Sequence, residues 1–197
     1  MSPYIRLAKK AVEAYIKKGE MIKVPSDCSE EMINKKSGVF VTIEEKVKGL
    51  PAKEEKFVLR GCIGTYLPTK ENIAQEIIHN AIAAATEDYR FGQIEKEELP
   101  SLSYTVYILS TPELVEDVKT LDPKIYGIIV KTSPISHSDG TDVVFNGHSV
   151  PKSALLLPDL AGINTIEEQI LIACQKGSID PLKEKIIIYK FKVEKYA

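Results

Sequence analysis

The chain has 197 residues, of which 44% are hydrophobic and 27% are charged, and 26 basic against 28 acidic side chains leave a net charge of −2. This composition excludes a disordered chain, and a near-neutral surface gives no general attraction to nucleic acid or anionic lipid. The three cysteines lie far apart in sequence, so they form no Cys-x-x-Cys pair and fit poorly with a disulfide framework. We therefore expect a cytoplasmic protein with reduced thiols and no signal peptide or membrane span. Abundant Lys, Glu and Ile, without Trp, lean toward a thermophilic source.

The chain opens with a predicted helix. Ser2 followed by Pro3 is typical of a helix start, and Gly19 is typical of a helix end. Apolar residues recur between them at helical spacing. Residues 23–36 show no clear period and predict a loop.

Two strands and a long helix follow. β-branched residues predict strands over 38–47 and 56–60, joined by a turn at 48–51. The second strand leads into a Gly-rich segment. Thr69 is then the predicted N-cap of an amphipathic helix that ends near Asp88.

The second half predicts several short strands and one capped helix. Pro112 indicates a helix start over 110–113, and Thr165 with Glu168 forms a capping box for a helix that ends at Gly177. Residues 132–140 are polar and predict an exposed loop, and an Asn-Gly turn follows Phe145. Strands are predicted over 104–109, 126–131, 143–145, 154–157 and 185–193.

The order of elements indicates an α+β fold. Strands and helices do not alternate strictly, which disfavours a doubly wound parallel sheet. A strand, Pro68 and a Thr69-capped helix are echoed by a strand, Pro158 and a Thr165-capped helix, which hints at internal duplication. We predict a single domain over 1–197, divided into subdomains of about 1–110 and 111–197.

Residues 60–65, Arg-Gly-Cys-Ile-Gly-Thr, are the principal candidate site. Glycines at alternate positions let a backbone bend, adopt positive φ or admit a ligand closely, and N–H groups at such a turn can bind an anion or oxyanion. Arg60 supplies a planar cation suited to carboxylate or phosphate, and it could favour the thiolate of Cys62, a nucleophile or soft metal ligand. The candidate ligand-binding residues are Arg60, Gly61, Gly64 and Thr65.

Structural interpretations of the same residues stay open. A small cysteine is often a buried filler, and two glycines can mark a β-bulge. The segment is neither a phosphate loop nor a dinucleotide fingerprint. His137, Asp139, Asp142 and His148 crowd together and could hold a metal, but they are more simply solvated loop residues, so no metal site is predicted.

Residues 59–65 resemble the hallmark motif of the AMMECR-one domain family. The resemblance covers nearly the whole chain and implies two related halves whose strands curve into one barrel-like, mostly antiparallel sheet flanked by helices. It extends to residues 38–42, 88–91, 104–114, 126–130, 155–158 and 173–177.

The resemblance also implies a function class. It favours a polar pocket for a small anionic ligand, in which Asp88 and Arg90 face the Cys62 segment. The alternative is that Asp88 and Arg90 form an exposed turn with a salt bridge that contributes little. The resemblance associates the protein with a Memo-like protein and a radical S-adenosylmethionine protein, as an enzyme or enzyme component. The cofactor and reaction stay unidentified. The alternative is a non-catalytic protein-interaction module, in which the motif is only a fold element.

Overall fold

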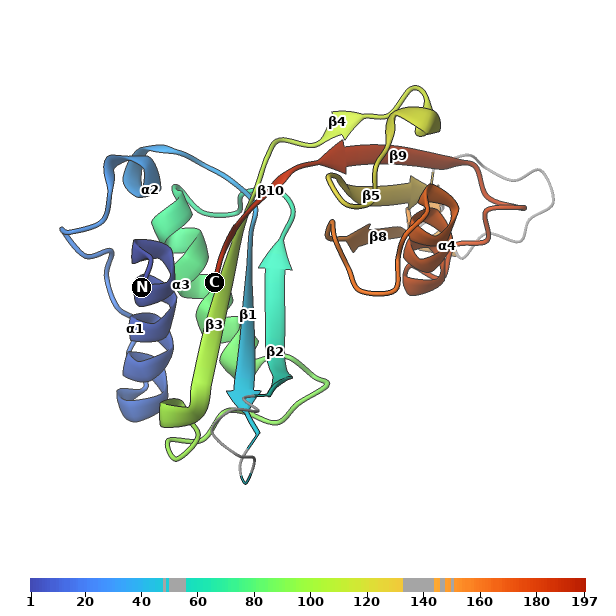
Figure 1. The fold of residues 1–197 in the computed structure, drawn as a ribbon. Coiled ribbons are helices and arrows are strands. Elements are labelled where there is room, and N and C mark those ends of the chain that lie inside the picture. The colour runs from blue at the N-terminus through green and yellow to red at the C-terminus, as the bar shows by residue number, and fades with distance from the viewer. Residues whose placement is uncertain (48, 50–55, 133–143, 146–147, 150) are drawn as a thin grey trace. The chain divides into compact units, whose positions relative to one another are not determined.

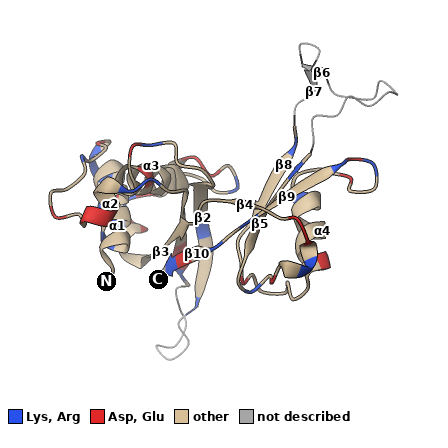
Figure 2. Cartoon of the chain, turned by 90° about the horizontal axis from the view of Figure 1, so that it is seen from above, with Lys and Arg blue, Asp and Glu red and all other residues tan. Residues whose placement is uncertain are grey.

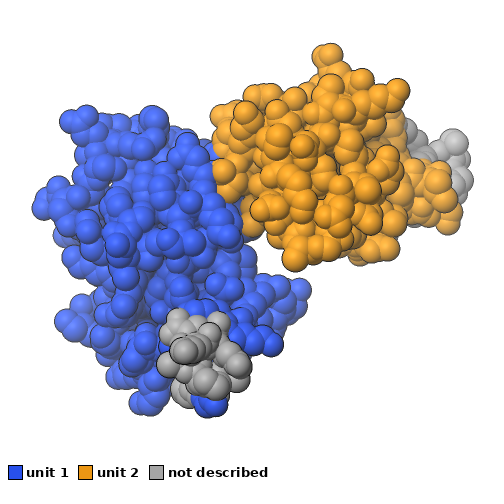
Figure 3. Space-filling view, in the orientation of Figure 1, with its two compact units in different colours: residues 1–109, 194–197 blue, residues 110–193 orange. Residues whose placement is uncertain are grey.

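The computed structural model describes residues 1–47, 49, 56–132, 144–145, 148–149 and 151–197, and it forms two compact units (Figure 1; Figure 3). Unit 1 comprises Met1–Leu109 and Glu194–Ala197, and unit 2 comprises Ser110–Val193. The strands β3 (Leu102–Leu109) and β10 (Val193–Tyr196) are neighbours in one sheet. Unit 2 is therefore inserted into the chain of unit 1 between these two strands.

Unit 1 contains a four-stranded sheet in the order β10-β3-β1-β2. The central strand β1 (Val39–Lys46) pairs antiparallel with β3 and with β2 (Phe57–Thr65). Val39, Val41 and Ile43 are fully buried, while the residues between them are only partly buried. This alternation is what a strand with one face on a core requires, and it confirms the strand predicted over 38–47.

Helices α1 (Pro3–Lys18) and α3 (Ile73–Thr86) cover one face of this sheet (Figure 1). The predicted ends of α1 are confirmed: the Ser2 side chain accepts a hydrogen bond from the Tyr4 N–H, and Gly19 adopts the left-handed conformation with φ of 72°. Both helices present small and branched apolar residues to one shared core. The sheet thus has an inner face under the helices and a second face turned away from them.

Two predictions in this unit are wrong. A short helix, α2 (Glu30–Asn34), lies within the region predicted as loop, where the Ser29 side chain caps it and Met32 is fully buried. The N-cap of α3 is Asn72, whose side chain accepts the Gln75 N–H at 2.9 Å, rather than Thr69. The first prediction failed because a five-residue helix is too short to show a helical period in the sequence. The second failed because Thr69 and Asn72 are both suitable N-cap residues, and only one of them can cap the helix.

Unit 2 has its own four-stranded sheet, in the order β4-β9-β5-β8, with one helix packed on it. The predicted capping box of this helix is confirmed, because the Thr165 and Glu168 side chains each accept a backbone N–H from the other residue. The helix start predicted at 110–113 is wrong: a two-residue strand there pairs with β9. The elements are β4 (Glu113–Leu114), β5 (Gly127–Thr132), β8 (Ser153–Leu156), α4 (Ile166–Lys176) and β9 (Ile186–Phe191).

A further pair of short strands, β6 (Val144–Phe145) and β7 (His148–Ser149), forms a separate antiparallel ribbon. The turns predicted at 48–51 and 146–147 and the loop predicted over 132–140 fall largely outside the described residues. In the described parts of the chain, no helix is long and apolar enough to cross a membrane. Acidic and basic residues are interspersed through both units (Figure 2).

The expected single curved, barrel-like sheet is wrong. The α+β class holds, but the main strands form two separate four-stranded sheets, and no closed barrel is found among the described residues. Each sheet buries one face against its own helices and has its own hydrophobic core.

Candidate functional site

The candidate motif lies inside a strand rather than after one. β2 continues through Thr65, and residues 61–65 pair in regular register with residues 39–43 of β1. The predicted end of the strand at residue 60 is therefore wrong, because glycines in an edge strand can still pair. The register shifts once: Ile43 faces Gly61 and Glu44 faces Leu59, which leaves Arg60 as the extra residue of a β-bulge.

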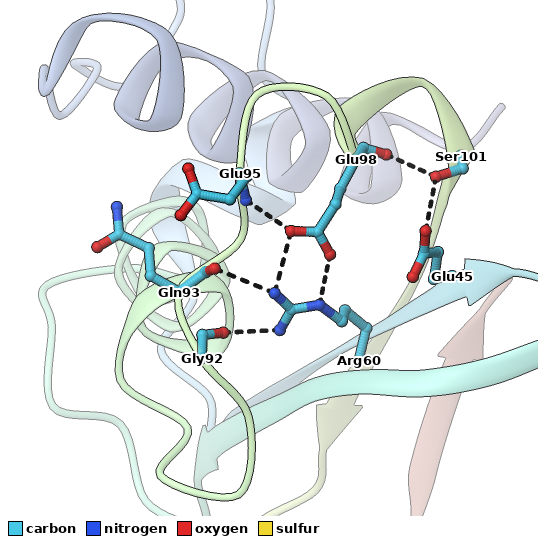
Figure 4. A network of polar contacts seen from close by, with 7 residues as sticks. All are labelled: Glu45, Arg60, Gly92, Gln93, Glu95, Glu98 and Ser101. Carbon is cyan, nitrogen blue, oxygen red and sulfur yellow. Dashed lines mark hydrogen bonds and ion pairs between the residues drawn. The ribbon is translucent and has the colours of Figure 1, made fainter.

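Arg60 directs its guanidinium to the loop that follows α3 (Figure 4). Its Nε donates to Glu98 Oε1 at 2.6 Å, and its Nη2 donates to Glu98 Oε2 at 3.1 Å. The two Nη groups also donate to the carbonyl oxygens of Gly92, at 2.7 Å, and Gln93, at 3.1 Å. This side chain is only 16% exposed. Arg60 therefore anchors the loop by a bidentate ion pair of the strongest geometric class.

The two motif glycines permit close packing. A Cβ at Gly61 would lie 2.1 Å from the carbonyl oxygen of Ala84 in α3. A Cβ at Gly64 would lie 2.3 Å from the ring of Phe40 and 2.4 Å from the Val39 carbonyl oxygen. Neither glycine is among the positive-φ residues. Their role in the described structure is close approach by the protein itself, not a left-handed turn.

Cys62, Asp88 and Arg90 are brought together at the outer edge of β2. The Cys62 N–H donates to Asp88 Oδ2 at 2.8 Å, and Arg90 Nη2 donates to the same oxygen at 2.7 Å. Arg90 Nε and its backbone N–H donate to Oδ1. The Arg90 hydrogen bonds lower the pKa of the buried Asp88 to about 2, against the opposing effect of burial, and the Cys62 N–H adds to this lowering. Asp88 is therefore a carboxylate at neutral pH.

The side chain of Cys62 lies on the sheet face turned away from α1 and α3, which we call the outer face. Its register partner Thr42 donates from Oγ1 to Cys62 Sγ at 3.2 Å. The Tyr107 side chain, from β3, lies near Thr42 on the same face. Burial raises the pKa of the Tyr107 hydroxyl, and the contact with Thr42 offsets part of that rise. β1 and β2 thus place the Thr42 hydroxyl beside the Cys62 thiol, and β3 places Tyr107 opposite Phe40, diagonally across from Thr42.

Thr65 points to the opposite face of the sheet. Its hydroxyl donates to Glu76 Oε1 at 2.8 Å, and Glu76 is 1% exposed. The Thr69 hydroxyl and the N–H groups of Thr69 and Lys70 donate to the same carboxylate. Burial alone would raise the pKa of Glu76, but these hydrogen bonds outweigh it and lower the pKa. The carboxylate fixes the segment between β2 and α3.

The predicted site residues therefore divide into two groups. Cys62, Asp88 and Arg90 share one location, while Arg60 contacts the 92–98 loop and Thr65 contacts Glu76. Sequence reasoning missed Thr42 and Tyr107. Their polar side chains at alternate positions of predicted strands were a visible signal, but only the pairing register brings them to Cys62.

The His137, Asp139 and Asp142 positions of the alternative metal cluster lie outside the described residues. Among the residues that the structure does describe, no group of three His, Cys, Asp or Glu side chains could hold a metal ion.

Comparisons with known proteins identify the family. The AMMECR1 family model matches residues 5–196. The chain belongs to the AMMECR1 family. A Thermotoga maritima protein is 41% identical over 194 residues, which cover 98% of this chain and 97% of that protein. A Clostridium acetobutylicum protein is 40% identical over 196 residues, but the match covers only 36% of its length.

A solved structure supports the fold. The crystal structure of an uncharacterized Pyrococcus horikoshii protein matches with a TM-score of 0.76 and 30% sequence identity. The match covers 98% of this chain and 88% of that one. Relatives of this AMMECR1-family protein thus include thermophilic bacterial and archaeal proteins, consistent with its composition.

Proposed function

We propose that this AMMECR1-family protein is an enzyme or enzyme component whose reactive group is Cys62, with Arg90 as the cation that binds a small anionic ligand. The observation that supports this most is the carboxylate that joins them. One oxygen of Asp88 accepts both the Cys62 N–H and Arg90 Nη2. Because Asp88 is buried and charged, it holds the Cys62 backbone and the Arg90 guanidinium on one carboxylate before any ligand arrives.

The chemistry of such a centre follows from its parts. A thiolate is the nucleophilic form of cysteine, and a hydroxyl donor at the sulfur, here Thr42, stabilises it. Arg90 shares Asp88 Oδ2 with the Cys62 N–H, and the Arg90 side chain is 46% exposed. Its Nε and Nη2 are engaged by Asp88, while Nη1 has no hydrogen-bond partner among the described residues and can meet a carboxylate or phosphate.

The other motif residues have supporting roles in this proposal. Arg60, Gly61, Gly64 and Thr65 set the path of β2 and of the loops beside it, and the ligand contacts the centre that they shape. The family resemblance adds the partners: we expect the protein to act with a Memo-like protein and a radical S-adenosylmethionine protein in the cytoplasm.

Native cysteine labelling tests the proposal. We expect iodoacetamide to modify Cys62 first, as mass spectrometry of the native protein would show. Cys174 is fully buried, and burial also raises its pKa. The pKa of Cys28 is raised mainly by burial and also by the nearby Asp27 carboxylate. Both thiols should therefore react more slowly than Cys62. Thr42→Val should slow the alkylation of Cys62 without altering the alkylation rate of Cys28. If Cys62 stays unmodified until the protein unfolds, the nucleophile is excluded.

A protein-interaction module is the second candidate, favoured by a different observation. Phe57, Val58 and Leu59 are 39%, 45% and 41% exposed, and they lie consecutively on the edge strand β2. An exposed apolar edge strand can be extended by a strand of a partner. Val58→Lys should then abolish binding of a Memo-like protein while native labelling of Cys62 is unchanged. If Val58→Lys leaves the binding of the Memo-like protein intact, the interaction-module candidate fails and the enzyme is favoured.

A further inference from the structure

Unit 2 contains a pocket that is separate from the Cys62 centre. Its volume is about 200 Å³, and it lies where β4, β9 and the start of β5 are neighbours (Figure 1). At about 30 Å³ per water, this is space for roughly seven waters, or for one small organic acid or phosphate. The lining residues are Ser110, Glu113, Tyr126, Lys190, Phe191 and Lys192.

Two lysines converge on one aromatic ring in this pocket. Lys190 Nζ lies 5.0 Å from the centroid of the Tyr126 ring, and Lys192 Nζ lies 5.7 Å from it. The lysines are two residues apart in an extended segment, so their side chains project to the same side. The Lys192 N–H donates to Ser110 Oγ at 2.9 Å, which fixes the backbone at that point.

The charges of these lysines are not balanced by the protein. Within the described residues, neither Lys190 nor Lys192 forms an ion pair. Glu113 is the register partner of Lys190 between β4 and β9 and also lines the pocket. One carboxylate against two ammonium groups leaves an excess of one positive charge. Two like charges that share one ring are stabilised when an anion lies between them.

We propose that this pocket binds a small anion through a phosphate or carboxylate group held between Lys190 and Lys192, with the Tyr126 ring beside it. Glu113 opposes ligands of high negative charge, so the ligand is a small monoanion or dianion. The pocket and its residues belong to unit 2, and the proposal is independent of any chemistry at Cys62.

An NMR titration of the full ¹⁵N-labelled chain tests this, with inorganic phosphate and, separately, malonate as probes at constant ionic strength. We expect the backbone amides of Tyr126, Lys190 and Lys192 to shift saturably with at least one probe. Lys190→Gln and Lys192→Gln should each weaken binding about tenfold, as loss of a charged hydrogen bond implies. Saturation by phosphate alone assigns a phosphate ligand, and saturation by malonate alone assigns a carboxylate.

Two further variants separate a built site from general charge. Lys131→Gln is the matched control, because Lys131 Nζ lies 5.4 Å from the ring of Tyr189 and does not line the pocket; it should leave the affinity unchanged. Glu113→Gln should strengthen binding about threefold by removing the opposing charge. Shifts that do not saturate with either probe, or an equal loss of affinity in Lys131→Gln, would overturn the proposal.

Discussion

The Asp88→Asn substitution has an effect whose size follows from the structure. The pKa of Asp88 is lowered from 3.8 to about 2, chiefly by the Arg90 hydrogen bonds. At about 1.4 kcal/mol per tenfold change in proton affinity, this corresponds to about 2.5 kcal/mol of folding free energy at neutral pH. Because Asp88 is 6% exposed, solvent screening reduces this little. We therefore expect Asp88→Asn to lower the free energy of unfolding by about 2 to 3 kcal/mol.

The pH dependence gives this prediction its sharpest test. A lowered native pKa stabilises the fold fully above the unfolded value of 3.8, and the stabilisation is lost as the pH falls through about 2. The free energy of unfolding of the wild type should therefore exceed that of Asp88→Asn by about 1 kcal/mol less at about pH 3 than at neutral pH. Urea unfolding at both pH values measures it.

An exposed aspartate provides the control. Asp27 has a side chain that is 72% exposed and lies 3.8 Å from Arg6, so Asp27→Asn should change stability by less than about 0.5 kcal/mol. An Asp88→Asn loss that is the same at both pH values would show that the carboxylate charge is not what stabilises the site, and the reasoning would be refuted.

Two further predictions concern the rest of the motif. Arg60→Gln removes the bidentate pair with Glu98 and should lower the free energy of unfolding by about 2 kcal/mol, measured by urea unfolding; a loss under about 0.5 kcal/mol would contradict the anchoring role. Gly61→Ala should cost at least about 2 kcal/mol, since its Cβ meets the Ala84 carbonyl oxygen, whereas Gly92→Ala, with nothing within 4 Å, should be nearly neutral in the same assay. Equal effects of the two glycine variants would exclude close packing as the reason for Gly61.

Local signals in the sequence predicted much of the fold. The Ser2 and Gly19 ends of α1 and the Thr165–Glu168 capping box are formed by neighbouring residues, so the sequence contains all that determines them. The β1 strand is likewise visible in its β-branched residues. Local sequence could not decide whether Asn72 or Thr69 caps α3. Both the N–H and the hydroxyl of Thr69 donate to the buried carboxylate of Glu76, so Thr69 does not act as the cap.

The candidate site was predicted only in part, because its contacts span long stretches of chain. Asp88 contacts Cys62 across 26 residues of sequence, and Glu98 contacts Arg60 across 38. Neither contact can be inferred from the spacing of residues in the sequence. The residues around Cys62 predicted that a cation lies near the thiol, and Arg60 was the expected cation. In the structure, the cation that shares a carboxylate with the Cys62 N–H is Arg90. The bulge residue Arg60 instead contacts residues 92–98, farther along the loop that holds Asp88 and Arg90.

Charge selectivity at Cys62 tests the central claim most directly. Iodoacetate is anionic and iodoacetamide is neutral, so the ratio of their rates at one thiol reports a nearby cation. If Arg90 and Cys62 form one anion-binding centre, Arg90→Gln should lower that ratio at Cys62 about threefold or more, and Arg90→Lys should largely retain it. The ratio at Cys28 should not change. A ratio at Cys62 that is the same in wild type and Arg90→Gln would contradict the account.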